Sequence, residues 1–178
     1  MKMKLMLGFF AMATLSLFSF KNHQPKTEDG IQWMTWEEAV MLNAESPKKI
    51  FVDVYTDWCG WCKRMDKNTF SDPEIIKYMN ENFYAVKLNA EQKEDIVFNG
   101  NTFKFVENGK NGFHELAYSL LDGSLGFPTM VILDENFSRI LLSPGYKEAH
   151  DLMTELQFSA GEYYKKTSFD EFQMGGGE

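Results

Sequence analysis

Runs of hydrophobic residues alternate along this 178-residue chain with segments that carry helix-start signals. Residues 50–55 are apolar and mostly β-branched or aromatic, interrupted only by Asp53, which is typical of a buried parallel strand. Similar runs predict three further strands, at 83–88, 129–133 and 139–142. The segments around them predict five helices, at 35–45, 59–67, 71–79, 113–121 and 147–165.

Two of these helices have recognisable N-terminal caps. Thr35 and Glu38 have the spacing of a capping box, in which each side chain accepts a hydrogen bond from the other residue's backbone N–H. Asp72 supplies a capping side chain, and Pro73 suits the first helical turn. The first half of the chain has the strand–helix–strand order of a parallel unit, and the second half has a β-hairpin. This order predicts an α/β fold, with a central mixed β-sheet flanked by helices on both faces.

Residues 95–111 form an insertion before the helix at 113–121. Strand signals at 96–98 and 102–106 flank Asn99-Gly100-Asn101, a combination typical of a β-hairpin, and residues 108–112 are a turn-rich break. We expect an ordered hairpin that either extends the edge of the sheet or forms a surface for a partner. The sequence leaves these two alternatives open.

The first twenty residues have the pattern of a secretory signal peptide. Lys2 and Lys4 give a basic start, and residues 5–20 carry no charge and are mostly apolar. We therefore expect a periplasmic or other extracytoplasmic location, with a membrane tether left open, although about 16 residues is short of the ~20 that span a bilayer. The expected organisation is a signal peptide at 1–20, a linker at 21–33, one domain at 34–166 and a tail at 167–178.

Composition and charge limit the classes of partner. The chain is 44% hydrophobic and 15% aromatic, so it can bury a core. Its 18 basic and 26 acidic residues give a net charge of −8. We expect neither a nucleic-acid partner nor a polybasic membrane dock, because both need clustered Lys and Arg. We also expect a monomer, and two cysteines exclude a scaffold of several disulfides.

The candidate chemistry lies at Cys59 and Cys62, which follow a predicted strand and open a helix. Two cysteines at this spacing can form a disulfide across the first helical turn, and the helix N-terminus favours the thiolate of the first one. We therefore expect Cys59 to be the exposed nucleophile and Cys62 to resolve the mixed disulfide. The neighbouring Trp58 and Trp61 are expected to shape a docking face around the thiol.

Two other interpretations of the cysteine pair compete with a redox role. Half of a zinc site would need two more ligands, and only His23, His114 and His150 remain among the Cys and His residues. An inert structural disulfide would add little stability, because the closed loop is short. We expect His114 and His150 to be solvated helix residues.

Residues 51–63, which read FVDVYTDWCGWCK, resemble the active-site strand and turn of thioredoxins. Asp53 stands where that family has a buried acid, and Lys87 where it has the lysine that pairs with this acid. Phe127-Pro128 is similar to the cis-proline turn that faces the disulfide, and Gly145 to the glycine after the final hairpin. The resemblance implies a thioredoxin fold with a redox-active disulfide.

The resemblance covers about residues 35–157. It is closer to exported thioredoxin-like proteins, because Lys63-Arg64-Met65 and residues 70–74, which read FSDPE, match their motifs. It implies a thiol–disulfide oxidoreductase that needs no metal ion and no dissociable cofactor, since the dithiol is the redox group. The site residues it implies, together with those expected from the motif, are catalytic Cys59, Cys62, Asp53 and Lys87, and substrate-binding Trp58, Gly60, Trp61, Phe127 and Pro128.

The direction of electron transfer depends on the residues between the cysteines. Thioredoxins have Gly-Pro there and strong oxidants have His, whereas Gly60-Trp61 brings no charge to support a thiolate. We expect reduction of disulfides in extracytoplasmic proteins, with a membrane-bound reductase as electron donor. Oxidation or isomerisation stays open, as does a different class of function, a non-catalytic interaction module with a static disulfide.

Overall fold

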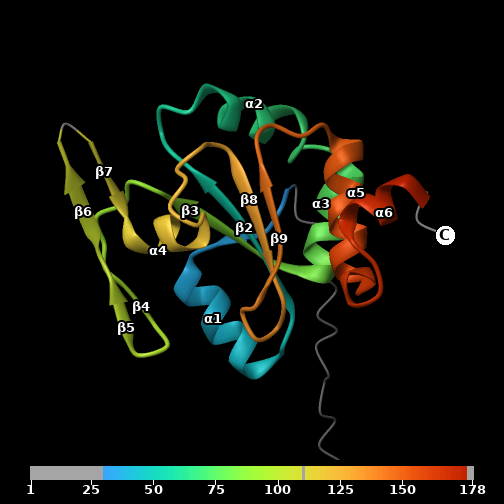
Figure 1. Ribbon diagram of the computed structural model, residues 1–178, viewed down its shortest axis with the longest axis horizontal. Helices are drawn as coiled ribbons and strands as arrows, with labels where there is room; N and C mark the ends of the chain where they lie inside the picture. Colours follow the sequence, from blue (N-terminus) through green and yellow to red (C-terminus); the bar gives the residue numbers. More distant parts are fainter. Residues whose placement is uncertain (1–29, 110, 176–178) are drawn as a thin grey trace, which may run out of the picture.

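The computed structural model describes residues 30–109 and 111–175. The expected signal peptide at 1–20 and most of the expected linker lie outside these residues. At the centre is a five-stranded sheet of order β1-β3-β2-β8-β9 (Figure 1). The first three strands in this order run parallel to one another. Strand β8 is antiparallel to β2 and to β9, so the predicted mixed sheet is confirmed. The strands are β1 (Trp33–Met34), β2 (Lys49–Tyr55), β3 (Phe83–Asn89), β8 (Thr129–Leu133) and β9 (Arg139–Pro144).

Helices cover both faces of this sheet, as the sequence predicts (Figure 1). One face carries α1 (Trp36–Glu45) and α4 (Glu115–Leu120). The opposite face carries α2 (Gly60–Asn68), α3 (Pro73–Asn82) and α5 (Ala149–Ala160). The alternation along β2 divides its side chains between the two faces.

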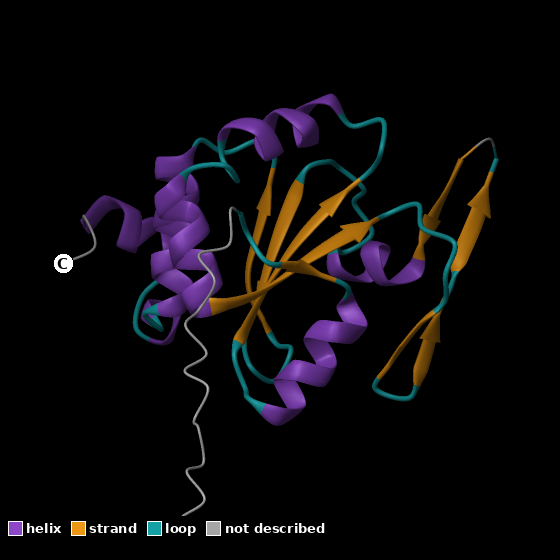
Figure 2. Ribbon diagram, turned by 180° about the vertical axis from the view of Figure 1, so that it is seen from behind, coloured by secondary structure: helices purple, strands orange, loops and turns teal. Residues whose placement is uncertain are grey.

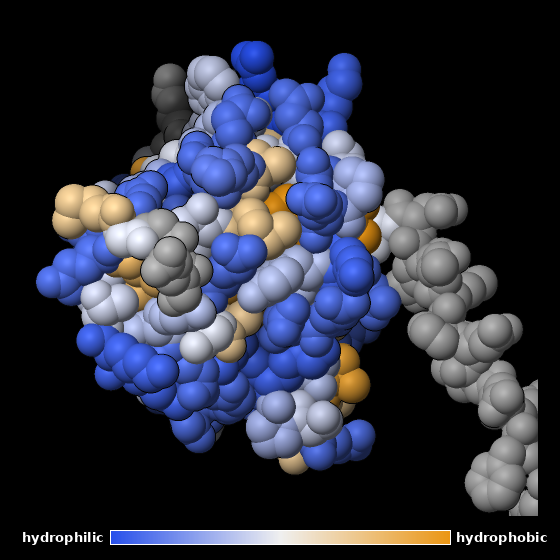
Figure 3. All heavy atoms as spheres, turned by 90° about the vertical axis from the view of Figure 1, so that its right-hand side faces the viewer, coloured by the Kyte–Doolittle hydropathy of each residue, from blue (hydrophilic) through white to orange (hydrophobic). Residues whose placement is uncertain are grey.

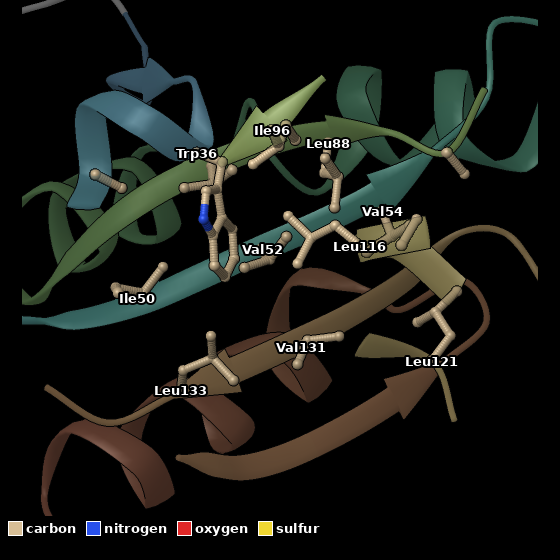
Figure 4. Packing of buried hydrophobic residues seen from close by; sticks show 14 residues of the cluster. Trp36, Ile50, Val52, Val54, Leu88, Ile96, Leu116, Leu121, Val131 and Leu133 are labelled. Carbon is tan, nitrogen blue, oxygen red and sulfur yellow. The ribbon is translucent and has the colours of Figure 1, made fainter. Parts of the chain in front are cut away.

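The two faces bury separate hydrophobic clusters. Ile50, Val52 and Val54 of β2 point into the first cluster, where side chains from α1, β3, α4 and β8 converge (Figure 4). Phe51 points the other way, against Met65 of α2 and residues of α3 and α5. Because Asp53 has the same parity as Phe51, it lies on the face that α2 covers.

Both predicted caps are present. The Glu38 backbone N–H donates to Thr35 Oγ1 at 3.2 Å, and the Thr35 N–H donates to Glu38 Oε2 at 2.8 Å. Asp72 Oδ1 accepts from the backbone N–H groups of Glu74 and Ile75, with Pro73 as the first residue of α3. Side-chain oxygens thus satisfy N–H groups that a helix leaves without intrahelical partners.

The insertion forms two ribbons rather than the single predicted hairpin. The first pairs β4 (Ile96–Phe98) with β5 (Asn101–Phe103) around the predicted Asn99-Gly100 turn, whose residues both have positive φ. The second pairs β6 (Phe105–Asn108) with β7 (Asn111–His114) across the segment expected to be only a break. Both ribbons are separate two-stranded sheets on the side of α4, so the alternative in which the insertion extends the main sheet is wrong (Figure 2).

The C-terminal part is more divided than the single helix expected at 147–165. Helix α5 ends at Ala160, and Glu162 adopts a left-handed conformation with φ of 59° that stops the helix. A 3₁₀ turn (Tyr163–Lys165) and α6 (Phe169–Gly175) follow, the latter within the expected tail. The face seen in Figure 3, which includes α5, is mostly hydrophilic, with apolar side chains in small separate patches. Within the described part of the chain, no helix has the length and hydrophobicity needed to cross a membrane.

Candidate active site

Cys59 and Cys62 form a disulfide at the N-terminus of α2, directly after β2. Their Cα atoms are 5.3 Å apart. Cys59 is the N-cap residue of α2, and its Sγ accepts a hydrogen bond from the Cys62 backbone N–H at 3.0 Å. A sulfur at this position is stabilised as a thiolate, because both the N–H group and the helix dipole favour negative charge there.

The disulfide itself is nearly covered in this oxidised form. Cys59 is 4% exposed and Cys62 is 2% exposed, so the expectation that Cys59 is the exposed sulfur is not met. The position of Cys59 at the N-cap, rather than its exposure, distinguishes the two sulfurs. The flanking Trp58 and Trp61, by contrast, are 65% and 56% exposed.

Aromatic rings lie on both sides of the disulfide loop. Trp58 packs edge-on against Phe127, with ring centroids 6.0 Å apart, and its Nε1–H donates to Glu91 Oε1 at 3.0 Å. Trp61 lies 5.6 Å from the ring of Tyr146, and the Arg64 guanidinium stacks over it. The loop therefore carries two exposed indoles fixed by neighbouring side chains.

The Phe127–Pro128 peptide bond is cis and lies at the same end of the sheet as the disulfide. The register sets this position, because Thr129 pairs with Val54 near the end of β2. The Gly145 backbone N–H donates to the Pro128 carbonyl at 2.8 Å, with Gly145 at a φ of +86° that side-chain-bearing residues rarely adopt. The structure thus brings together the turn and the glycine that the sequence singled out.

Asp53 and Lys87 form the ion pair that the resemblance implies. They are directly paired in the register of β2 and β3, and Lys87 Nζ donates to Asp53 Oδ2 at 2.6 Å. Asp53 is 1% exposed, and its Oδ1 has no hydrogen-bond partner among the described residues. Burial raises the pKa of Asp53, and the attraction of Lys87 only partly opposes this shift.

A second carboxylate, Asp66 of α2, also accepts a hydrogen bond from Lys87. It stands four residues after Cys62, which places both on one side of the helix. Burial opposes the charge on Lys87, but its two carboxylates outweigh burial and raise its pKa. Asp66 is not among the site residues predicted from the sequence, although its i,i+4 spacing from Cys62 is a signal that points to it.

His114 is not the solvated residue that the sequence suggested. It is fully buried and caps α4, where its Nδ1 accepts from the Leu116 backbone N–H at 3.3 Å and its Nε2–H donates to the Glu94 carbonyl at 3.2 Å. Burial lowers its pKa, so the imidazole stays neutral and structural. Within the described residues, no group of three or more His, Cys, Asp or Glu side chains could hold a metal ion.

Solved structures that resemble this chain have the same fold. A structure described as DsbH oxidoreductase has a TM-score of 0.54 at 16% identity and covers 80% of this chain and 92% of its own. A thioredoxin-fold protein from Helicobacter pylori has a TM-score of 0.56 at 18% identity, with coverages of 81% and 84%. The thioredoxin fold expected from the sequence is therefore confirmed.

Curated relatives match part of the chain. The uncharacterized protein B0495.5 of Caenorhabditis elegans is 28% identical over 118 residues, which are 57% of this chain and 16% of that protein. The thiol:disulfide interchange protein DsbD of Haemophilus ducreyi is 30% identical over 95 residues, 53% of this chain and 13% of DsbD. The matched segment is thus a small part of each relative.

A family described as "Thioredox_DsbH: Protein of unknown function, DUF255" matches residues 19–160, which include the disulfide, the ion pair, the insertion and the cis-proline turn. The match extends over most of the chain. The chain therefore belongs to this thioredoxin-like family.

Proposed function

We propose that this chain is an extracytoplasmic thiol–disulfide oxidoreductase that reduces disulfides in other proteins. The observation that carries the proposal is the Cys59–Cys62 disulfide at the N-terminus of α2, with Cys59 Sγ accepting the Cys62 N–H. This geometry favours a thiolate at Cys59 once the bond is reduced. The apolar stretch at 5–20 supports export.

The reaction starts from the reduced pair. The Cys59 thiolate attacks one sulfur of a substrate disulfide, so that a mixed disulfide forms and a substrate thiolate leaves and takes up a proton. Cys62 then loses its proton and attacks Cys59 Sγ, which restores the Cys59–Cys62 disulfide and releases the second substrate thiol. In total, two electrons pass from the protein to the substrate, together with the proton that Cys62 loses, while the first substrate thiolate takes its proton from solvent.

The buried acid has a role in the second step. Asp53 lies on the face of β2 that α2 covers, and burial raises its pKa, which moves its proton exchange toward neutral pH. We assign it the proton relay for Cys62. Lys87 holds the carboxylate when it is ionised, and Asp66 shares this cation.

The substrate docks on the face formed by Trp58, Gly60, Trp61, Phe127 and Pro128. A dithiol donor must then return two electrons to the Cys59–Cys62 disulfide and become a disulfide itself, and we propose a membrane-bound reductase for this step. The protein acts as a monomer and needs no dissociable cofactor on this proposal, because the cysteine pair carries the electrons.

Insulin reduction tests the function directly. With dithiothreitol as donor, the wild-type chain should accelerate insulin precipitation, and Cys59→Ser should not. A non-catalytic interaction module with a static disulfide predicts that both proteins leave the rate at that of dithiothreitol alone. That result would reject the enzymatic function.

A further inference from the structure

The second ribbon of the insertion forms one wall of a groove beside the active-site loop. The groove has a volume of about 420 Å³. Asp57 of the active-site loop and Glu91 of the segment after β3 line one part of it, and Phe105 and Glu107 of β6 line another. Because side chains two residues apart in a strand point to the same face, β6 presents both Phe105 and Glu107 toward the groove.

The groove is continuous with the disulfide loop. Glu91 lines the groove and accepts a hydrogen bond from the Trp58 indole at 3.0 Å, and Trp58 directly precedes Cys59 in the chain. One Cα–Cα step of ~3.8 Å, the length of an indole side chain and this hydrogen bond place Glu91 Oε1 at most about 11 Å from Cys59 Cα. An extended polypeptide covers this distance in about three residues.

The groove is acidic. Asp57, Glu91 and Glu107 contribute three carboxylates, against one lysine, Lys93, whose ammonium lies over the Phe105 ring. Asp57 and Glu107 form no ion pair with any described residue. Among the described residues, these carboxylates do not form a cluster that could hold a metal ion. The unpaired carboxylates of Asp57 and Glu107 suit the charged head of a Lys or Arg side chain.

We propose that this groove binds a basic, extended segment of the disulfide-bearing protein substrate, beginning about three residues from the cysteine that Cys59 attacks. The inference rests on the proposed function, because it identifies the substrate class of the same site. The occupant is a polypeptide with Lys or Arg at alternate positions. The insertion thereby selects the substrate, while the aromatic residues around the disulfide dock the reacting segment.

Binding of cysteine-free peptides tests the groove without requiring turnover. Two fluorescein-labelled ten-residue peptides carry serine in place of the cysteine and differ only in having Lys or Glu at two alternate positions. Fluorescence anisotropy with the full chain should give a Kd about 5-fold lower for the Lys peptide at low salt, and added salt should reduce this preference.

Charge-reversal variants locate the preference. Glu107→Lys should remove it, whereas Glu81→Lys, an equal charge change at an exposed position of α3 on the opposite face, should leave it intact. The proposal would be overturned if the wild-type chain bound the two peptides with equal Kd values. It would also be overturned if both variants lost the preference for the Lys peptide to the same extent. Reduction of neutral bis(2-hydroxyethyl) disulfide is measured in parallel. Its absence would reject the proposed function, while the anisotropy result decides whether the groove binds basic segments.

Discussion

Replacing Ile96 by alanine tests whether the insertion is part of the hydrophobic core. Ile96 begins β4, is 1% exposed and belongs to the cluster that contains Trp36 and Val52 (Figure 4). The substitution removes three carbons, which at ~0.8 kcal/mol each gives about 2.4 kcal/mol of lost transfer free energy. A partly relaxed cavity adds to this cost, so we expect the free energy of unfolding to fall by about 3 kcal/mol.

The adjacent residue provides the matched control. Val97 lies on the same strand but is 63% exposed, so Val97→Ala should cost less than about 1 kcal/mol. In urea unfolding followed by tryptophan fluorescence, a slope of about 2 kcal/mol/M turns the Ile96→Ala effect into a midpoint shift of about 1.5 M. Equal shifts for the two variants, or a loss below about 1 kcal/mol for Ile96→Ala, would refute the reasoning and make the insertion an appendage.

Three further predictions concern the redox site. Cys62→Ser should accumulate mixed disulfides with substrate proteins on non-reducing gels and Cys59→Ser should not, because the attacking sulfur of Cys59 caps α2. Equal accumulation in both variants would contradict the assignment of Cys59 as the attacking residue. Burial raises the pKa of Asp53, so its stabilising contribution is complete below the unfolded-state pKa and is lost as pH rises through the folded-state pKa. Asp53→Asn should therefore gain stability relative to wild type as pH rises above the unfolded-state pKa of Asp53, and should slow mixed-disulfide resolution. A variant with unchanged kinetics and lower stability would instead indicate a structural ion pair with Lys87. The potential of the cysteine pair should lie nearer −270 mV than −120 mV in glutathione equilibration, and a value above roughly −180 mV would contradict a reducing role.

Local signals were sufficient for the elements that build the main sheet. The apolar run of β2 specifies a buried strand, and the Thr35 and Asp72 caps specify where α1 and α3 begin. These signals work because the interacting groups are within a few residues of one another, or because burial on both faces requires continuous hydrophobicity.

The second ribbon could not be predicted in the same way. Its strands are four residues long, and its turn was interpreted as a break between the first hairpin and a helix. A contact distant in sequence holds its end: the His114 backbone N–H donates to the Ala90 carbonyl at 2.7 Å. No local pattern encodes this contact, and for the same reason the sequence does not predict that His114 is buried.

The family resemblance was enough to predict part of the candidate site. Contacts between side chains that are far apart in sequence could not be predicted, because only the fold brings them together. Asp53 and Lys87 are 34 residues apart in sequence, and only the resemblance pairs them before the register of β2 and β3 is known. Glu91 contacts Trp58 across 33 residues, and nothing local in its sequence surroundings indicates this.

Two tasks are separated around the end of β2. Asp53 faces α2, where it meets Lys87 and where a proton relay to Cys62 would act. The acidic groove lies beyond the opposite side of the loop, where Glu91 holds Trp58 and the insertion supplies the far wall. On the proposed function, charge changes in the groove should therefore alter which substrates are reduced without changing the potential of the cysteine pair. Changes at Asp53 should alter the rate of resolution for every substrate alike.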